Sequence, residues 1–414
     1  MRELSIPLEE AARLSGPLAF NIMLKPAGSL CNLDCAYCYY LDKSALYGGR
    51  EPRMSMDTLE GVTRAYIEAN DVPEVQFVWH GGEPLLLGLD FFRKAVQFQR
   101  KYAGGKTVFN SIQTNGTLLD AAWARFFREN NFLVGLSLDG PEDIHDRYRT
   151  DRGGAPTFRK VTDGLRILRE EGVPFNTLTT VSRAGEGRGA EVYQFLKAAG
   201  GCYMQFLPVV EYVRLKGKNT RPEIVEPLTP GAVPAFWSVS AEGFGDYMNA
   251  IFDQWIKADV GRCFVQLFDA TLACWAGEPP SLCSMCPTCG HAGVIEHNGD
   301  VYSCDHFVFP EYLLGNIHRD TITSMMYSKR QLQFGRDKYE RLPHQCKVCQ
   351  WRFVCNGGCP KDRFCQTADG EPGLNYLCQD YRQFFAHVAP YMDFMKNELL
   401  HQRPPANVMK WTLE

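Results

Sequence analysis

The sequence contains no long apolar run and no excess of charge of one sign. Its uninterrupted apolar stretches fall well short of the roughly 20 residues that a membrane-spanning helix needs. A net charge of -4 over 414 residues gives no electrostatic reason to expect a nucleic acid or an anionic membrane as a partner. The composition, with 45% hydrophobic and 22% charged residues, is that of a globular protein with a large core.

The first residues also lack the pattern of a secretory leader, because Met1–Ile6 include charged residues and no long apolar stretch follows them. We therefore expect a cytoplasmic protein, and disulfides are rare in that compartment. The chain nevertheless has 16 cysteines, which are better explained by metal or cluster binding. Their distribution agrees, since three lie near the N-terminus and twelve lie between Cys263 and Cys378.

Short β-rich runs alternate with amphipathic helical patterns between about residues 17 and 210. This alternation predicts a parallel sheet, and the repeat is too short for a closed eight-stranded barrel, so we expect an open partial barrel or a doubly wound sheet. The predicted strands are Leu18–Leu24, Val75–Trp79, Thr107–Gln113, Leu133–Leu138, Phe175–Val181 and Tyr203–Pro208. The predicted helices are Met56–Asn70, Asp90–Tyr102, Asp120–Asn130, Phe158–Glu171 and Ala190–Ala199.

The pattern changes beyond residue 210. Residues 211–240 are irregular and rich in Pro, Lys and Arg, which predicts a connecting loop. Helices are expected over Ala241–Ala258 and Tyr381–Leu400, on either side of a cysteine-rich region at about 281–380. Polar and glycine-rich segments follow most predicted strands, so we expect the functional residues at the carboxyl ends of the sheet.

The segment C-N-L-D-C-A-Y-C places Cys31, Cys35 and Cys38 at the spacing C-x3-C-x2-C. Three thiolates on one short loop can hold three irons of a cubane cluster and leave its fourth iron open to a small molecule. The alternatives are three buried thiols or a zinc site completed by a distant ligand, but zinc sites usually use paired C-x2-C elements. Tyr37 directly precedes Cys38, where its ring would cover the cluster or its ligand.

A second cysteine pattern, C-x2-C-x5-C-x3-C, lies near the end of the chain and is followed by one more cysteine. A zinc ribbon is one interpretation of its first four members. That interpretation leaves other late cysteines without a purpose. The ribbon would use Cys346, Cys349, Cys355 and Cys359, and it would leave out Cys283, Cys289, Cys304 and Cys378.

The N-terminal triplet is the signature of the radical S-adenosylmethionine (SAM) enzymes, and the chain resembles that superfamily. The late pattern resembles the SPASM domain, which carries two auxiliary [4Fe–4S] clusters. Within this subfamily the chain is most similar to anaerobic sulfatase-maturating enzymes, which oxidise a sulfatase cysteine or serine to Cα-formylglycine. The similarity covers residues from about 17 to 385 and includes H-G-G-E-P, S-L-D-G-P-E-D-I-H-D, G-D-V-Y-S-C-D and C-K-V-C-Q-W-R-F-V-C-N-G-G-C-P.

The resemblance implies an α/β fold, in which a partial (β/α)6 barrel precedes a SPASM domain and a C-terminal helix. We expect the barrel over residues 1–240, a helical linker over 241–280, the SPASM domain over 281–385 and a helix with a tail over 386–414. The implied cofactors are three [4Fe–4S] clusters and SAM. The implied partners are a sulfatase polypeptide with an extended Cys or Ser motif and an electron donor such as flavodoxin or ferredoxin.

The same resemblance assigns ligands to the three clusters. Cys31, Cys35 and Cys38 would hold the cluster whose open iron binds SAM. Cys286 lies between two assigned residues and competes with Cys283 as a ligand. The first auxiliary cluster would take Cys283, Cys289, Cys304 and Cys359, and the second would take Cys346, Cys349, Cys355 and Cys378. The cysteines left over are Cys202, Cys263, Cys274, Cys286 and Cys365.

Contacts to SAM follow in the same way. Tyr37 and the glycine pair that ends at Gly82 would approach the ligand closely, and Glu83 would accept from its ammonium group. Each further candidate has a plainer alternative, such as an exposed arginine at a helix start, or a valine that is simply part of the core. These candidates are Ser137 and Asp139 at the ribose, Arg149 at the carboxylate and Val210 at the adenine.

Formylglycine formation removes a hydrogen atom from Cβ, and then an electron and a proton. Asp305 directly follows Cys304, and the resemblance makes this carboxylate the general base, which must lie within hydrogen-bond reach of its proton. The alternative is a carboxylate that accepts from a backbone amide at a strand end. Tyr40 and His80 are weaker candidates for substrate contacts.

Two other functions fit parts of the sequence. One is a SPASM enzyme that forms thioether or carbon–carbon crosslinks in a peptide. Such enzymes often carry an N-terminal peptide-binding domain, whereas only about 16 residues precede the first predicted strand. The other is a non-catalytic iron–sulfur carrier or redox sensor. The open iron and the SAM-like motifs argue against a carrier.

Overall fold

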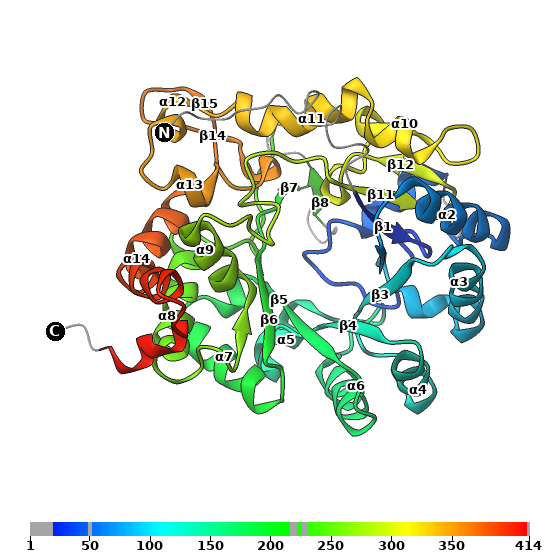
Figure 1. The fold of residues 1–414 in the computed structure, drawn as a ribbon, viewed down its shortest axis with the longest axis horizontal. Helices are drawn as coiled ribbons and strands as arrows, with labels where there is room; N and C mark the ends of the chain where they lie inside the picture. Colours follow the sequence, from blue (N-terminus) through cyan, green and yellow to red (C-terminus); the bar gives the residue numbers. More distant parts are fainter. Residues whose placement is uncertain (1–19, 49–51, 216–221, 226–230, 412–414) are drawn as a thin grey trace.

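The fold of the computed structural model is a curved sheet with helices on its outer side (Figure 1). The structure describes residues 20–48, 52–215, 222–225 and 231–411. Six neighbouring strands run parallel in chain order, which confirms the predicted partial (β/α)6 barrel. They are β1 (Asn21–Lys25), β2 (Glu74–Trp79), β3 (Thr107–Thr114), β4 (Phe132–Ser137), β5 (Phe175–Val181) and β6 (Tyr203–Pro208). Leu18 and Ala19, at the start of the first predicted strand, lie outside the described residues.

Five of the six helices between these strands agree with the predicted ones to within about one residue at each end, and α5 (Glu142–Tyr148) was not predicted. Side chains at their first turns explain where two of them begin. Ser55 Oγ accepts from the backbone N–H of Thr58, and the Asp120 carboxylate accepts from two backbone N–H groups of its helix. The helices are α2 (Met56–Ala69), α3 (Leu89–Tyr102), α4 (Ala121–Glu129), α5 (Glu142–Tyr148), α6 (Phe158–Glu170) and α7 (Gly189–Ala198).

The sheet continues beyond the barrel on both sides. Strand β11 (Ala292–Glu296) pairs in parallel with β1, and β12 (Asp300–Tyr302) and β13 (Leu313–Asn316) follow in antiparallel order. At the other edge β10 (Phe264–Val265) pairs with β6. The predicted domain boundary at residue 281 therefore does not interrupt the sheet. Strand β11, which lies between Cys289 and Cys304 in the sequence, is therefore a direct neighbour of the first barrel strand, β1.

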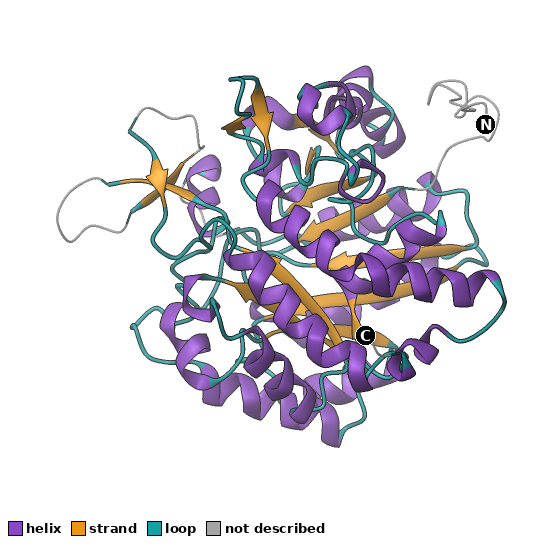
Figure 2. Cartoon of the chain, turned by 90° about the vertical axis from the view of Figure 1, so that its left-hand side faces the viewer, coloured by secondary structure: helices purple, strands orange, loops and turns teal. Residues whose placement is uncertain are grey.

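The predicted connecting loop over 211–240 is partly wrong. Three short antiparallel strands form a separate small sheet there: β7 (Tyr212–Arg214), β8 (Glu223–Val225) and β9 (Val233–Pro234) (Figure 2). Strands of two or three residues carry too little alternation to be recognised in a Pro-rich sequence. Residues at the base of this sheet, Val213 and Trp237, pack in one apolar cluster with Cys35 and Tyr37.

The C-terminal half is mainly helical. Helices α8 (Gly243–Ala258) and α14 (Cys378–Leu400) confirm the two predicted helices, and α14 packs on α8 and on α9 (Gln266–Ala276) (Figure 1). None of the helices in the described part of the chain is long and apolar enough to cross a membrane. The smaller elements are α10 (Ile322–Met326), α11 (Lys329–Glu340), α12 (His344–Lys347), α13 (Arg352–Cys355), β14 (Cys365–Gln366) and β15 (Pro372–Leu374).

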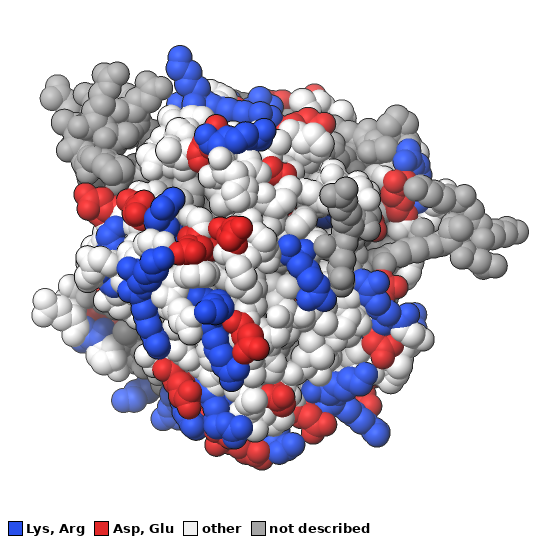
Figure 3. Space-filling view, turned by 90° about the vertical axis from the view of Figure 1, so that its right-hand side faces the viewer, with Lys and Arg blue, Asp and Glu red and all other residues white. Residues whose placement is uncertain are grey.

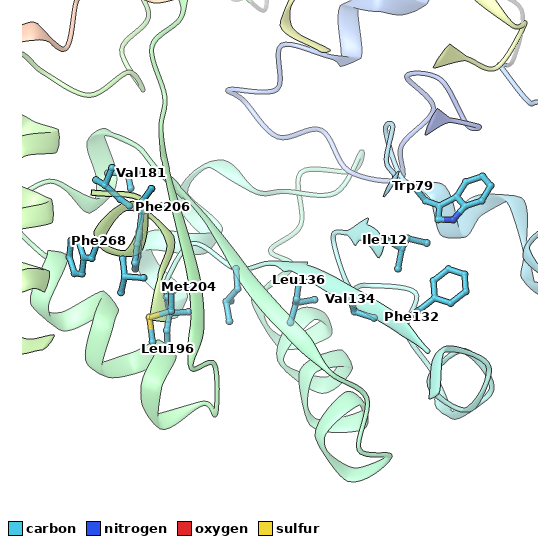
Figure 4. Close-up of a cluster of buried hydrophobic side chains, with 14 of the residues drawn as sticks. Trp79, Ile112, Phe132, Val134, Leu136, Val181, Leu196, Met204, Phe206 and Phe268 are labelled. Carbon is cyan, nitrogen blue, oxygen red and sulfur yellow. The ribbon is translucent and has the colours of Figure 1, made fainter. Parts of the chain in front are cut away.

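The core lies between the sheet and the outer helices. On β4 the side chains of Phe132, Val134 and Leu136 alternate onto one buried face, as the two-residue period of a strand requires. Met204 and Phe206 continue this layer on β6 (Figure 4). The polar side chains that follow the barrel strands lie at their carboxyl ends, outside this apolar layer.

Substitution of Gly189, the first residue of α7, tests the packing of α7 against α8. A Cβ on Gly189 would lie 2.2 Å from the carbonyl oxygen of Tyr247, so Gly189→Ala must move a helix. We expect this change to lower the free energy of unfolding by about 1–3 kcal/mol. The matched control is Gly61→Ala in α2, where a Cβ meets only the side chain of Ile317 at 3.9 Å. It should stabilise the protein by about 0.5–1 kcal/mol in anaerobic thermal unfolding. Equal effects of the two variants would contradict this packing.

Candidate active site

The three N-terminal cysteines lie on the loop between β1 and the short helix Leu41–Tyr47. Backbone hydrogen bonds from Asp34 to Thr150 and from Ala36 to Tyr148 hold this loop against the residues that follow α5. The backbone N–H of Leu33 donates to Cys31 Sγ at 3.4 Å. Such N–H groups stabilise a thiolate, which is the form that binds iron.

The electrostatics of this loop fit a cationic iron group. Burial raises the pKa of Cys31 to about 12, and the nearby charges of Glu83 and Cys38 raise it as well. Burial also raises the pKa of Cys35, with further contributions from Cys38 and Cys31. The three thiols therefore lie close enough to disfavour one another's ionisation. A bound cluster would supply the positive charge that this donor set lacks.

The glycine pair predicted to approach a ligand packs against the cysteine loop. Gly82 N–H donates to Gly28 O at 2.7 Å, and Glu83 N–H donates to Leu30 O at 2.8 Å. A Cβ on Gly82 would lie 2.1 Å from Leu30 O, so a side chain does not fit there. The strand end after β2 and the cysteine loop therefore form one unit.

The Glu83 carboxylate is fully buried and is hydrogen-bonded inside the protein. It accepts from the backbone N–H groups of Leu85 and Asn115 and from Thr114 Oγ1, at 2.8–3.0 Å. Burial raises its pKa to about 7. These bonds join the ends of β2 and β3. The contact of Glu83 with the SAM ammonium stays a prediction.

Tyr37, Asp139 and Arg149 form one buried network. Arg149 donates to both carboxylate oxygens of Asp139, at 2.9 and 3.1 Å, and the Tyr37 hydroxyl donates to the same carboxylate. Burial alone would raise the pKa of Asp139, but the guanidinium of Arg149 holds it below its ordinary value. The structure thus brings together three of the predicted SAM contacts. Arg149 is a buried partner of Asp139 and not an exposed arginine.

Two other predicted SAM contacts lie apart from this network. Ser137 Oγ at the end of β4 accepts from Gln113 Nε2 at 2.9 Å. Val210 is buried just beyond β6, and its carbonyl oxygen lies 3.4 Å from Lys361 Nζ. Both residues sit at carboxyl ends of barrel strands, which is the edge that the sequence pattern predicted.

The late cysteines divide into two groups. Burial raises the pKa of Cys355 to about 12, and the thiols of Cys378, Cys346 and Cys349 add to the shift. These four cysteines line one cavity, and Cys359 does not. Burial likewise raises the pKa of Cys359 to about 12 and that of Cys304 well above its ordinary value, with contributions from neighbouring thiols. Those neighbours are Cys289 for Cys359, and Cys359 and Cys283 for Cys304.

The cavity is lined by the four cysteines proposed for the second auxiliary cluster and not by Cys359, which a zinc ribbon would require, and both ligand sets stay predictions. Within the described ranges, no three His, Cys, Asp or Glu side chains gather closely enough to hold a single metal ion. The thiol of Cys286 is directed to the carbonyl oxygens of Pro280 and Leu282, at 3.8 and 3.5 Å. Cys283 contributes to the raised pKa of Cys304, and both Cys283 and Cys286 contribute to that of Cys289, so the choice between these two ligands stays a prediction.

Asp305 lies in a buried cluster with two residues that the sequence analysis missed. Lys25, the last residue of β1, is 0% exposed, and its Nζ lies 2.5 Å from Asp305 Oδ1. The Tyr39 hydroxyl donates to Asp305 Oδ2 at 2.5 Å. Burial alone would raise the pKa of Asp305, but the charge of Lys25 holds it well below its ordinary value. This carboxylate pairs with the side chains of Lys25 and Tyr39, whereas the plainer alternative would have a backbone amide as its partner.

Tyr40 and His80 belong to the same cluster. Lys25 Nζ lies 4.1 Å from the centre of the Tyr40 ring and 3.1 Å from His80 Nδ1. The Tyr40 hydroxyl donates to Glu296 on β11. Burial, and then the charge of Lys25, lower the pKa of His80 to about 4. Lys25 ends the strand N-I-M-L-K, and a charged residue in this position is the sequence signal that could have marked it as a functional candidate.

Comparisons with known proteins agree with this arrangement. Residues 26–195 match the Radical SAM superfamily, and residues 283–350 match the SPASM iron–sulfur cluster-binding domain. A serine-type anaerobic sulfatase-maturating enzyme of Bacteroides thetaiotaomicron is 52% identical over 390 residues, which are 94% of each chain. A cysteine-type enzyme of Clostridium perfringens is 33% identical and covers 92% of this chain and 99% of its own.

Solved structures show the same similarity. Native anSMEcpe with bound AdoMet and Cp18Cys peptide superposes with a TM-score of 0.80 at 31% identity. The match covers 92% of this chain and 100% of that one. SuiB of Streptococcus suis, bound to the precursor peptide SuiA, has a TM-score of 0.58 at 14% identity, which is a likeness of fold alone.

The cysteine grouping predicts the iron content of single variants. Anaerobically prepared protein should contain about twelve irons per chain if all three clusters are cubanes. Cys355→Ala and Cys359→Ala should each lose about four of these irons, because each removes a ligand from a different group. Cys365→Ala, which changes an unassigned cysteine, should keep them all. Iron analysis that finds about four irons in the unmodified protein would contradict the grouping.

Proposed function

Because the chain belongs to the anaerobic sulfatase-maturating enzymes, which oxidise a sulfatase serine or cysteine to Cα-formylglycine, we propose that its own target is a serine. The enzyme is a radical SAM oxidoreductase with [4Fe–4S] clusters and SAM as cofactors, and a sulfatase polypeptide is its substrate. The serine assignment is supported by the relative that is 52% identical, which is named serine-type. The cysteine-type relatives are 31–33% identical.

When bound, the clusters and SAM supply a carbon radical that removes a hydrogen atom from Cβ, together with an acceptor for the electron that leaves next. The chain's residues must hold the target in place and take the remaining hydroxyl proton. Tyr37, Asp139 and Arg149 are proposed to shape the SAM pocket as one buried unit. Gly82 and Glu83 close its other side, and Ser137 and Val210 are proposed at the ribose and the adenine.

The observation that carries the proposed mechanism is the position of Asp305. It directly follows Cys304, which is a proposed ligand of the first auxiliary cluster. Lys25 and Tyr39 keep its carboxylate ionised and oriented in a buried setting. Asp305 is therefore proposed to take the hydroxyl proton of the target, and a cluster held by Cys304 and its partner cysteines would supply the acceptor for the accompanying electron.

Two proposals concern the surroundings of the enzyme. The electron that starts the reaction is proposed to come from a small redox protein such as flavodoxin or ferredoxin. The surface seen in Figure 3 carries Lys and Arg interspersed with Asp and Glu, without a patch of one sign on that face.

The cytoplasm is the proposed location, because thiols that hold clusters must remain reduced.

Asp305→Asn tests the base. The variant should keep its clusters and still form 5′-deoxyadenosine from SAM, while formylglycine product falls by about 100-fold or more. Asp163→Asn is the control, since Asp163 is an exposed carboxylate on α6 that pairs with Arg166 at 3.8 Å. Mass spectrometry of the peptide gives the yield. An unchanged yield for Asp305→Asn would rule out the assignment.

Matched peptides test the target. A sulfatase-derived serine peptide, incubated anaerobically with SAM and a reductant, should lose two hydrogens and gain an aldehyde that a hydrazine reagent captures. A thioether or carbon–carbon crosslink would lose mass without this capture. If the cysteine peptide is converted and the serine peptide is not, the serine assignment is wrong.

A further inference from the structure

Lys25 is a charged residue in a position that a sequence would normally give to an apolar side chain. It ends the strand N-I-M-L-K in the middle of the sheet, between β2 and β11. Its side chain is completely buried. Burying an ammonium group is costly unless it is paired, so such a lysine requires an explanation in its contacts.

The contacts of Lys25 Nζ reach three segments that are far apart in the sequence. Asp305 Oδ1 lies 2.5 Å away, beside the proposed first auxiliary cluster. His80 Nδ1 lies 3.1 Å away, at the start of the glycine pair. The face of the Tyr40 ring, just after the N-terminal cysteine loop, lies 4.1 Å away. One ammonium group thus contacts the proposed base, the residue before the glycine pair and a tyrosine that follows the cysteine loop.

Lys25 also determines which nitrogen of His80 carries the proton. Lys25 Nζ and the backbone N–H of Gly81, at 2.8 Å, both point at Nδ1, and both are donors. The Gly81 carbonyl oxygen lies farther from Nδ1, at 3.3 Å, so the two closer donors favour an accepting Nδ1 and place the proton of the neutral ring on Nε2. His80 is only partly buried, so this Nε2–H can donate to a ligand at the barrel mouth.

We propose that Lys25 is a positioning residue for the second half of the oxidation. It fixes the Asp305 carboxylate and holds His80 as the tautomer whose Nε2–H donates to the oxygen of the target serine. Lys25 does not touch the substrate, and it acts through these two side chains. The inference rests on the proposed function of Asp305 as the base.

The prediction concerns the ratio of two products. In the wild type, each 5′-deoxyadenosine that carries a hydrogen from the target should correspond to one formylglycine. In Lys25→Met, hydrogen removal should persist, whereas proton removal becomes slow because Asp305 is no longer held. The ratio of 5′-deoxyadenosine to formylglycine should rise at least about tenfold, and KM for the serine peptide should rise because His80 is less constrained.

The experiment uses the full chain with its clusters and a serine peptide deuterated at Cβ. Deuterium in 5′-deoxyadenosine reports hydrogen removal, and mass spectrometry reports formylglycine. Lys106→Met is the matched control, because Lys106 Nζ is also held by buried groups, the carbonyl oxygens of Ile67 and Asn70, but far from the site. Its product ratio should equal that of the wild type.

Lys25→Gln provides a second variant if Lys25→Met does not load iron. It keeps a polar side chain of shorter reach and no charge, and it should also raise the product ratio. A wild-type ratio in a Lys25 variant that has lost activity would show a merely structural role and overturn the proposal. If the wild type itself forms no formylglycine, the proposed function fails instead. If Asp305→Asn keeps its yield while the Lys25 variants raise the ratio, the base assignment fails and Lys25 acts through His80.

Discussion

The parallel pairing of β1 with β11 is the constraint on which the site depends. It joins the first barrel strand to the segment that carries the late cysteines, with Lys25 opposite Glu296 in the register. The loop after β1 carries Cys31, and the hairpin after β11 leads to Cys304 and Asp305. A separate auxiliary domain on a flexible linker could not hold Asp305 at 2.5 Å from a residue of β1. The continuous sheet therefore makes one site from two sequence regions.

The charged side chains at this junction are paired within the protein. Lys25 is fully buried and the Asp305 side chain is 16% exposed, so an unpaired charge on Lys25 there would be strongly unfavourable. Tyr39 and Tyr40 complete the set by donating to Asp305 and Glu296. A second buried network, Arg149 with Asp139 and Tyr37, stands behind the N-terminal cysteine loop in the same way. Both networks exchange solvent for fixed protein partners, which suits a site where a reactive radical must be kept from water.

Much of the fold was predictable because its elements are long and periodic. The six barrel strands and the helices around them follow hydrophobic patterns that one sequence can show. The sheet at β7, β8 and β9 was missed, because strands of two or three residues are made by pairing and not by periodicity. The family resemblance implied ligand sets that stay predictions, and the structure places Cys355 in one cavity with Cys346, Cys349 and Cys378. Lys25 and Tyr39 were missed, because their significance lies in Asp305, hundreds of residues away.

The sequence by itself determined the chemistry that is available. Spacing alone places three thiolates on one loop, because neighbouring residues cannot be far apart. The tertiary structure decided which late cysteines share a cavity and which side chains hold Asp305. It also decided that Arg149 is buried against Asp139, which an isolated R-Y-R segment does not reveal. The physical reason is the same in each case. Contacts between distant segments depend on strand order and register, and those follow from the packing of the whole sheet.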